Sequence, residues 1–270
     1  FVSHPSLNGA KLKVDMVCES KVNPGDCQED PDYPATERTI AHWKNSNFGT
    51  EVFTSEAPER TDTNPDRKSF MEFWPELTFT HRPNKFQETI DGIKQSVRFD
   101  SAGYILDFPR GEYYRQGAIF NKAMPILDVP ITKPEFSILT DVALHWKSAM
   151  ENPDQTRPQV AGKYIPGAVG TTPLTRMYTR RHQEDYNDNR NKTRRICNAE
   201  FRNEDRPGLQ CDAFPFPSSW EGSATNGGNN FSVALISAES NQAGGAWLSG
   251  WYVHDRVLDG DQYYVQVMKL

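Results

Sequence analysis

The sequence predicts an α+β fold, in which a β-rich N-terminal region precedes a small domain of mixed helices and strands. The stretch 68–80 is rich in Phe, Trp and Thr, which is typical of a strand. Apolar residues recur at helical spacing from Thr140, and Tyr and Val alternate over 262–268 as in a strand. We therefore divide the chain into an N-terminal region, 1–135, and a C-terminal domain, 136–270.

In the N-terminal region, residues 1–66 are expected to be irregular, because turn-forming residues are frequent there. The strand over 68–80 is expected to be interrupted at Pro75, since proline cannot donate a hydrogen bond to a sheet. Short extended segments are expected at 96–99 and 118–120. The sequence indicates no role for this region.

In the C-terminal domain, the hydrophobic pattern and the capping residues predict alternating helices and strands. Thr140 or Asp141 can cap the first helix, which should stop before Pro153, and Ser240 can cap the last helix. The expected elements are a helix from Thr140, a charged helix over 183–196, a strand over 231–236, a helix over 241–253 and a closing strand over 262–268. With a further short strand and a loop expected before 231–236, the order is helix, helix, short strand, loop, strand, helix, strand, which places a strand–loop–strand–helix arrangement at the centre of the domain.

Composition bounds the class of protein. The chain has 270 residues, of which 36% are hydrophobic and 11% aromatic, so it can build a core. Its net charge of -6 is unusual for a protein that holds nucleic acid tightly. No apolar run is long enough to cross a bilayer, so we expect no membrane partner. The motifs of zinc proteases, serine hydrolases and nucleotide-binding loops are absent from the sequence.

The four cysteines fall into two local pairs, Cys18 with Cys27 and Cys197 with Cys211. An even, paired number fits disulfides formed in an oxidising compartment. Reduced, buried thiols are the alternative. Neither pair has the spacing of a zinc knuckle.

Two carboxylates, Asp212 and Glu221, flank an aromatic, proline-rich stretch. Proline stiffens such a stretch, which can then hold the two carboxylates at a fixed separation. Carboxylate oxygens suit Mg²⁺ or Mn²⁺, and a carboxylate can also take a proton from water. The alternative is a pair of ordinary surface acids beside a structural disulfide.

Two glycines, Gly244 and Gly245, lie near the start of the expected last helix, where they disfavour helix formation. Glycine there allows a substrate to approach closely, and a helix N-terminus favours phosphate. The alternative is that small residues let this helix pack tightly on the sheet.

A basic stretch is a further candidate for binding phosphate, because arginine contacts phosphate oxygens in pairs of hydrogen bonds. It consists of Arg176, Arg180, Arg181, Arg190, Lys192, Arg194 and Arg195. Acidic residues interrupt it, so a solvated helical face with internal ion pairs is the alternative. His145 adjoins Trp146 on an apolar helix, where a core histidine is the alternative to a functional one.

Three blocks resemble, in the same order, the NucA/NucB-type deoxyribonucleases. The blocks run Cys211-Asp212-Ala213-Phe214-Pro215-Phe216, then Glu221-Gly222, then Asn241-Gln242-Ala243-Gly244. The tail from Arg256 to Val265 is similar to the closing turn and strand of the family, and the Ala143–Trp146 and Leu174–Arg176 segments are weaker matches. The resemblance covers roughly 140–267. Ala213 stands where the family usually has a second acidic residue. Whatever role that acidic residue has in the family is therefore not carried over to this chain.

The resemblance implies a secreted endonuclease that uses Mg²⁺ or Mn²⁺ to hydrolyse DNA with little sequence specificity. Its core would be similar to that of the His–Me-finger nucleases, with Asp212 as the base for water, and with Glu221 and Asn241 holding the metal ion. Glu221 thus counts with Asp212 among the catalytic residues. The residues expected to contact the DNA are Arg176, Arg180, Arg181, His145 and Gln242.

Two other functions fit the same sequence. A secreted module that only binds nucleic acid or another polymer would account for Ala213 and the acidic net charge. A nuclease toxin domain would use the same chemistry and would have a dedicated inhibitor protein as its partner. Metal-stimulated cleavage separates the first alternative from an active nuclease, and toxicity inside cells separates the second.

Overall fold

A computed structural model describes residues 4–20, 27–105, 116–131, 134–226 and 228–268. The chain divides into two compact units, one formed by the described residues up to 123 and the other by those from 124. The sequence suggested a boundary near residue 135, but strand β9 (Ile126–Pro130) pairs with the closing strand and so joins the C-terminal unit. Among the described residues, no helix combines the length and apolar character needed to cross a membrane.

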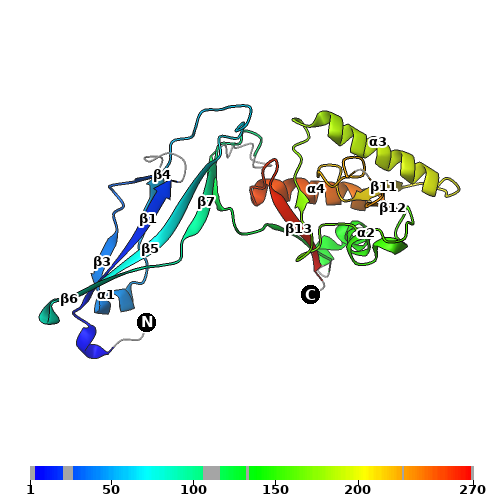
Figure 1. The fold of residues 1–270 in the computed structure, drawn as a ribbon. Coiled ribbons are helices and arrows are strands. Elements are labelled where there is room, and N and C mark those ends of the chain that lie inside the picture. The colour runs from blue at the N-terminus through cyan, green and yellow to red at the C-terminus, as the bar shows by residue number, and fades with distance from the viewer. Residues whose placement is uncertain (1–3, 21–26, 106–115, 132–133, 227, 269–270) are drawn as a thin grey trace. The chain divides into compact units, whose positions relative to one another are not determined.

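The N-terminal unit is built on one antiparallel sheet with the strand order β3-β1-β5-β7-β8, and β6 also pairs with β5. The strands are β1 (Lys11–Ser20), β3 (Thr36–Thr39), β5 (Ser69–His81), β6 (Phe86–Asp91), β7 (Gln95–Asp100) and β8 (Gly117–Phe120) (Figure 1). Strand β5 continues through Pro75, contrary to the expected interruption. Along one edge, β5 pairs with β7 as far as Phe73 and with β6 from Glu76, so Pro75 falls where the partner strand changes.

The expectation that residues 1–66 are irregular was wrong, because β1 is the principal partner of β5. Leu12, Val14 and Met16 alternate with charged residues along β1, and this period of two was obscured by the turn formers around it. Helix α1 (Ile40–Asn45) and the short strands β2 (Gln28–Glu29) and β4 (Phe53–Thr54) also fall within 1–66. The Cys18–Cys27 disulfide joins the end of β1 to the residue before β2.

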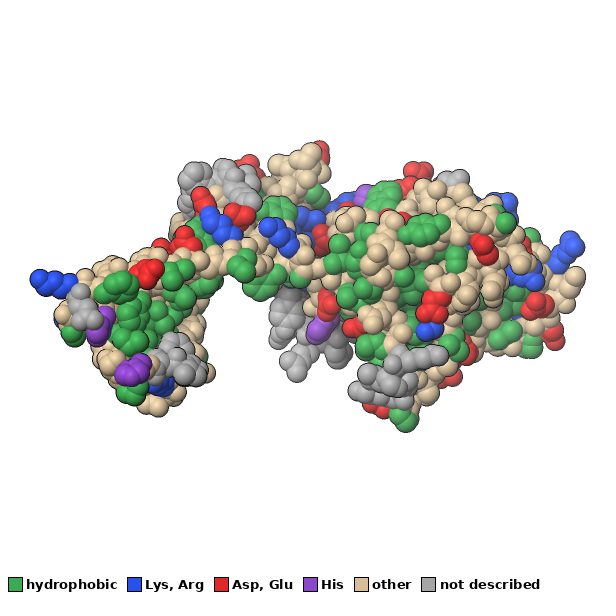
Figure 2. All heavy atoms as spheres, turned by 60° about the horizontal axis from the view of Figure 1, so that its bottom comes forward, with side chains coloured by type: hydrophobic (Ala, Val, Ile, Leu, Met, Phe, Trp, Pro, Cys, Tyr) green, Lys and Arg blue, Asp and Glu red, His purple; other side chains and the backbone are tan. Residues whose placement is uncertain are grey.

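Exposed apolar side chains are frequent on the N-terminal unit. Leu77 of β5 pairs with Ile90 of β6, and both are exposed, as is Ile93 just after β6. Figure 2 shows hydrophobic side chains gathered in patches on this unit.

Among its described residues, the C-terminal unit combines three α-helices with a three-stranded sheet and a separate two-stranded hairpin. The helices are α2 (Thr140–Glu151), α3 (Gln183–Glu200) and α4 (Ala238–His254). The sheet has the order β10-β13-β9, with β10 (Leu174–Thr175) antiparallel and β9 parallel to β13 (Gln262–Met268). Short 3-10 turns, Pro134–Leu139 and Pro153–Gln155, flank α2. Together with the N-terminal sheet, this arrangement confirms the predicted α+β class.

The hairpin of β11 (Leu209–Phe214) and β12 (Ser232–Ser237) precedes α4, so the order strand, loop, strand, helix is present. Alternate residues of a strand point to opposite faces. Asp212 and Phe214 therefore share one face, which contacts Trp146 of α2. Cys211 and Val233 lie on the other face and pack with Cys197 of α3. The hairpin thus has α2 on one side and α3 on the other.

The capping residues differ from those expected. Ser237, and not Ser240, caps α4, and its side chain accepts a hydrogen bond from the Ser240 backbone N–H. The Ser240 hydroxyl oxygen instead accepts the Val142 backbone N–H at the start of α2, 3.1 Å away. Leu139 takes the cap position of α2 without a side-chain hydrogen bond, so neither Thr140 nor Asp141 is the cap. Helix α4 thus begins earlier, and its first turn is bound to α2.

The two glycines of α4 have different surroundings. A Cβ on Gly244 would lie 2.8 Å from Cγ2 of Val142, so α4 and α2 pack closely at this point. Gly245 faces open space. The packing alternative is therefore correct for Gly244, although the partner is helix α2 and not the sheet.

Candidate active site

Asp212 lies in the middle of β11 with its side chain only 10% exposed. Its Oδ2 atom accepts hydrogen bonds from Nδ1 of His145 at 2.7 Å and from Nε1 of Trp146 at 3.0 Å. Both donors belong to α2, and among the described residues both side-chain hydrogen bonds to this carboxylate meet Oδ2. The Oδ1 oxygen is thus the one left for other chemistry.

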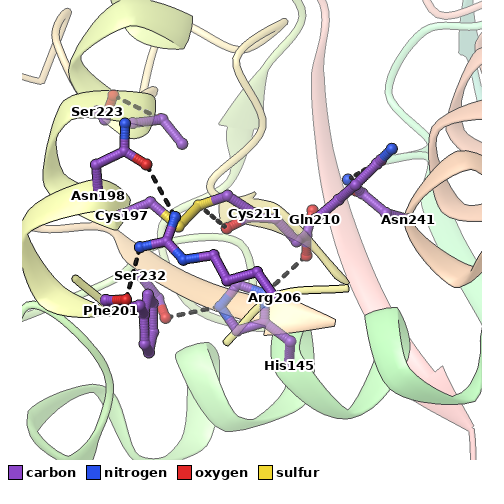
Figure 3. The surroundings of a disulfide bond; sticks show 12 residues. His145, Cys197, Asn198, Phe201, Arg206, Gln210, Cys211, Ser223, Ser232 and Asn241 are labelled. Atoms are coloured by element: carbon purple, nitrogen blue, oxygen red, sulfur yellow. Dashed lines mark hydrogen bonds and ion pairs between the residues drawn. A yellow bond between two sulfur atoms is a disulfide. The ribbon is translucent and has the colours of Figure 1, made fainter. Parts of the chain in front are cut away.

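His145 connects Asp212 to Ser232 on the neighbouring strand. Its Nε2 atom lies 2.8 Å from Oγ of Ser232, which is fully buried, and its own side chain is 5% exposed. Figure 3 shows the imidazole ring pointing toward Ser232, close to the Cys197–Cys211 disulfide. His145 is therefore a satisfied buried histidine that contacts the candidate base directly.

Aromatic rings pack beside His145 and Asp212. The centre of the Trp146 ring lies 4.8 Å from the centre of the Phe216 ring and 6.4 Å from that of the Phe214 ring. All three side chains are buried, so they exclude water from the inner side of Asp212. Trp220, the last aromatic residue before Glu221, contacts the ring of His182 instead.

Asn241 lies beside the same strand. Its Nδ2 donates to Oε1 of Gln210 at 3.1 Å (Figure 3). Gln210 shares a face of β11 with Asp212, because the two are separated by two positions. The structure therefore places Asn241 against the strand that carries the candidate base, two positions from it along that strand. Gln242 follows it and is exposed.

Glu221 has different partners. Its Oε2 atom accepts the Thr175 backbone N–H at 2.7 Å, and the Trp220 backbone N–H donates to the Thr175 carbonyl at 3.0 Å. The loop that follows β11 is thus fixed along the 174–177 segment. Among the described residues, Glu221 shares no hydrogen-bond partner with Asp212 or Asn241.

The three arginines expected to bind DNA differ in exposure. Arg176 is buried; its guanidinium donates to the Val257 carbonyl and lies 4.3 Å from the ring centre of Tyr252. Arg181 donates to Oδ2 of Asp259 at 2.7 Å, whereas Arg180 is exposed. Arg180 is therefore the one of the three that is exposed.

A pair of buried tyrosines lies under Arg176. The hydroxyls of Tyr252 and Tyr263 are 2.7 Å apart, and burial raises the pKa of each above its usual value of 10.0. Both therefore stay neutral near pH 7 and act as packing and hydrogen-bonding groups.

Asp259 forms a second pair with a histidine. Its Oδ1 accepts the Tyr178 backbone N–H at 2.8 Å, and its Oδ2 accepts from Arg181 and from Nε2 of His182 at 3.0 Å. Burial acts to raise the pKa of Asp259, but the hydrogen bonds from Tyr178, His182 and Arg181 outweigh it and lower that pKa. Asp259 is therefore a fixed anion at neutral pH.

Helix α3 supports the loop through a stripe of three residues at a spacing of four, Asn189, Thr193 and Cys197. The Asn189 side chain is fully buried; its Oδ1 accepts the backbone N–H groups of Ala224 and Thr225, and its Nδ2 donates to the Pro217 carbonyl. Gly222 fits against Asn189, since a Cβ there would lie 2.3 Å from Nδ2. Sequence reasoning missed Asn189, although its spacing from Thr193 and Cys197 was the available signal.

Thr193 and Cys197 extend the same stripe toward β11. The Thr193 hydroxyl lies 3.1 Å from that of Ser223, and Cys197 forms the expected disulfide with Cys211. This disulfide ends one residue before Asp212. Both predicted pairings, Cys18–Cys27 and Cys197–Cys211, are confirmed, and no cysteine is free.

The outer face of α3 carries charge. Arg190, Arg194 and Arg195 are exposed, while Lys192 is partly buried and donates to the Gly228 carbonyl at 2.8 Å. These residues lie from the middle of the helix onward, whereas its first turn contains Glu184 and Asp185. The basic stretch of the sequence is thus divided between buried structural groups and one exposed helical surface.

One group of three carboxylates in the N-terminal unit, Asp15, Glu29 and Glu51, has oxygen atoms within 4.8 Å of one another. Two of them already have partners: Nζ of Lys13 lies 2.5 Å from Asp15, and Glu51 accepts the Met16 backbone N–H at 2.7 Å.

Comparison with known proteins identifies the C-terminal part of the chain. No curated protein and no solved structure matches the chain. Residues 166–266, which include the hairpin, its loop, α3, α4 and most of β13, match the family deoxyribonuclease NucA/NucB. The C-terminal half of this chain thus carries a domain of the deoxyribonuclease NucA/NucB family, as its sequence motifs predicted.

Proposed function

We propose that the protein is a secreted, divalent-metal-dependent endonuclease that hydrolyses DNA with little sequence specificity. The family match over 166–266 supports a deoxyribonuclease. The observation that carries the proposal is the state of Asp212: it lies at the family's motif position, is held by two donors on Oδ2, and keeps Oδ1 for a proton. Two disulfides are compatible with secretion.

Asp212 is the general base of the proposed reaction. Its Oδ1 takes a proton from a water molecule, and the water oxygen forms a bond to phosphorus as the bond to the leaving oxygen breaks. The donors His145 and Trp146 fix the carboxylate in one orientation, which saves the cost of ordering it during the reaction.

Glu221 and Asn241 are the proposed ligands of Mg²⁺ or Mn²⁺. Both offer oxygen atoms, which suits a hard divalent cation. Glu221 uses Oε2 toward Thr175, and Asn241 uses Nδ2 toward Gln210, so each keeps an oxygen for an ion. When bound, such an ion would neutralise charge that develops on the phosphate.

Contacts to the DNA backbone are assigned to the exposed cations. Arg180 and the outer face of α3, with Arg190, Arg194 and Arg195, can reach a polyanion, whereas Arg176 and Arg181 hold the fold together. Gln242, exposed beside Asn241, is a further candidate contact. Backbone contacts carry no sequence code, so cleavage should be largely non-specific and binding should weaken as salt is added.

A plasmid-nicking assay of the purified chain with Mg²⁺, Mn²⁺ or EDTA tests the function. We expect cleavage with a metal ion, none with EDTA, and loss of cleavage in Glu221→Gln. Matched controls are Glu239→Gln and Gln262→Asn, which change exposed residues of the same unit. Undiminished cleavage by Glu221→Gln would remove it from the metal site, and cleavage in EDTA would remove the metal from the mechanism.

A second candidate function, DNA binding without cleavage, is favoured by Ala213. This residue stands where the family usually has a second acid, and in the structure its side chain is 5% exposed. The binding-only alternative predicts salt-sensitive retention of DNA without nicking under any metal ion. Nicking by the wild-type chain would exclude it.

A further inference from the structure

We propose that Ser232 and His145 form a buried relay that positions Asp212, with the Ser232 hydroxyl fixing which nitrogen of His145 carries the hydrogen. The proposal rests on the proposed role of Asp212 as the base. It gives His145 a positioning role in place of the DNA contact expected from the sequence.

The hydrogen-bond chain has one direction. A carboxylate only accepts, so His145 must carry hydrogen on Nδ1 to bind Oδ2 of Asp212 at 2.7 Å. In a neutral imidazole the other nitrogen then accepts, and the group facing Nε2 is the Ser232 hydroxyl at 2.8 Å. Ser232 donates to Nε2, His145 donates to Asp212, and the tautomer is fixed.

Burial excludes another use of the same three residues. A serine, a histidine and an aspartate in this order are also the parts of a hydrolytic triad. Ser232 is fully buried, however, and the His145 side chain is 5% exposed, so a substrate cannot reach the serine oxygen. The hydrogen bonds from Ser232 through His145 therefore act on Asp212 and not on a substrate.

The arrangement of the strands supports a positioning role. Ser232 lies opposite Phe214 in the hairpin and Asp212 lies opposite Ala234, so Ser232 and Asp212 are diagonal neighbours on the face toward α2. His145 bridges this diagonal from α2, and Trp146 adds the second hydrogen bond to Oδ2. One helix thereby fixes Oδ2 with two donors and leaves Oδ1 for the reaction.

Two measurements on the full chain test the relay. Nitrogen-15 NMR of the histidine side chains reports directly which ring nitrogen of His145 carries hydrogen. We expect the Nδ1–H form in the wild type and a mixture of forms in Ser232→Ala. Steady-state cleavage should show kcat lowered by about tenfold in Ser232→Ala with KM for DNA unchanged, because the base and not the binding surface is affected.

Substitutions of His145 separate positioning from packing. Asn keeps an N–H group near the position of Nδ1, whereas Leu removes the donor and keeps an apolar side chain. We expect His145→Leu to lower kcat by about 100-fold and His145→Asn to recover most of this loss. The control His182→Gln, in the second His–Asp pair, should leave the His145 NMR signals and kcat unchanged.

The outcomes are separable from those of the proposed function. An Nδ1–H form that persists in Ser232→Ala, or equal losses of kcat in His145→Leu and His145→Asn, would overturn the relay. A wild-type chain that never nicks DNA would instead overturn the proposed function, and the NMR result would still decide whether Ser232 fixes the tautomer.

Discussion

The C-terminal unit contains two His–Asp pairs that differ in how the carboxylate is used. In the pair of Asp212 and His145, the described donors meet one oxygen only. In the pair of Asp259 and His182, donors meet both oxygens, and a guanidinium is among them. The first carboxylate is oriented but keeps an atom for a proton, whereas the second is fixed as an anion. The same two residue types thus supply the proposed base in one place and a structural ion pair in the other.

Neutralising each aspartate in turn is the strongest test of whether the two His–Asp pairs differ in function. We expect Asp212→Asn to lower kcat by about 1,000-fold with the fold retained, because an amide cannot accept the proton from water. Asp259→Asn should keep kcat close to that of the wild type. Single-turnover nicking and circular dichroism of both variants measure this. Equal losses of activity would mean that the two pairs do not differ in function.

The disulfide beside Asp212 gives the next largest effect. Replacing Cys197 and Cys211 by alanine should destabilise the C-terminal unit by about 3 kcal/mol, as expected for a closed loop of this length. The control replaces Cys18 and Cys27, which lie in the other unit. Urea unfolding and nicking rates distinguish the two. If the control lost cleavage and the Cys197/Cys211 variant did not, the disulfide would have no part in holding Asp212.

Trp146→Phe sharpens the comparison further, because it removes one donor to Asp212 and keeps an aromatic ring. Loss of a hydrogen bond to a charged group should cost about 2 kcal/mol of folding free energy. Chemical denaturation measures this cost. Trp247→Phe serves as the control, since its Nε1 donates to the Asp128 carbonyl and not to a carboxylate. A smaller loss for Trp146→Phe than for the control would contradict the assigned hydrogen bond.

The smallest effect concerns pH. Because the pKa of Asp259 is lowered in the folded chain, its contribution is complete above its ordinary value of 3.8 and is lost as the pH falls through the lower folded value. Asp259→Asn should therefore be less stable than the wild type by about 1 kcal/mol at neutral pH. The two stabilities should converge below pH 3.8. Thermal unfolding across this range is the measurement, and a constant difference at all pH values would be the contrary result.

The sequence predicted the helices and the closing strand of the C-terminal unit closely, but not the strands β9 and β10. The closing strand over 262–268 has the expected limits, and α2 begins at Thr140 as expected. These segments carry strong periodicity and buried faces, so local pattern and tertiary packing agree. In the N-terminal unit β1 was missed, because a half-exposed strand carries charged residues at every second position and resembles a loop in composition.

The site was predictable only in part. Motif positions made Asp212, Glu221 and Asn241 the candidates, but spacing along the chain could not reveal that Glu221 accepts a hydrogen bond from Thr175. His145 lies 67 positions from Asp212, so its contact exists only once the hairpin packs on α2. The basic stretch led us to expect that Arg176 contacts DNA. Arg176 is instead buried against Tyr252, and charge alone does not reveal burial.

The stripe of Asn189, Thr193 and Cys197 marks the face of α3 whose residues the fold requires. The residues of the opposite face can be substituted more freely. The three residues of the stripe contact the segment 211–225 on successive turns of the inner face. Arg190, Arg194 and Arg195 are instead exposed on the outer face. Protein engineering can therefore rewrite the charge of the outer face to suit another polyanion or another salt concentration. The β11–β12 hairpin that packs on α3 would keep its shape. The affinity for the polyanion could therefore be changed on the outer face of α3 without changing the proposed cleavage site.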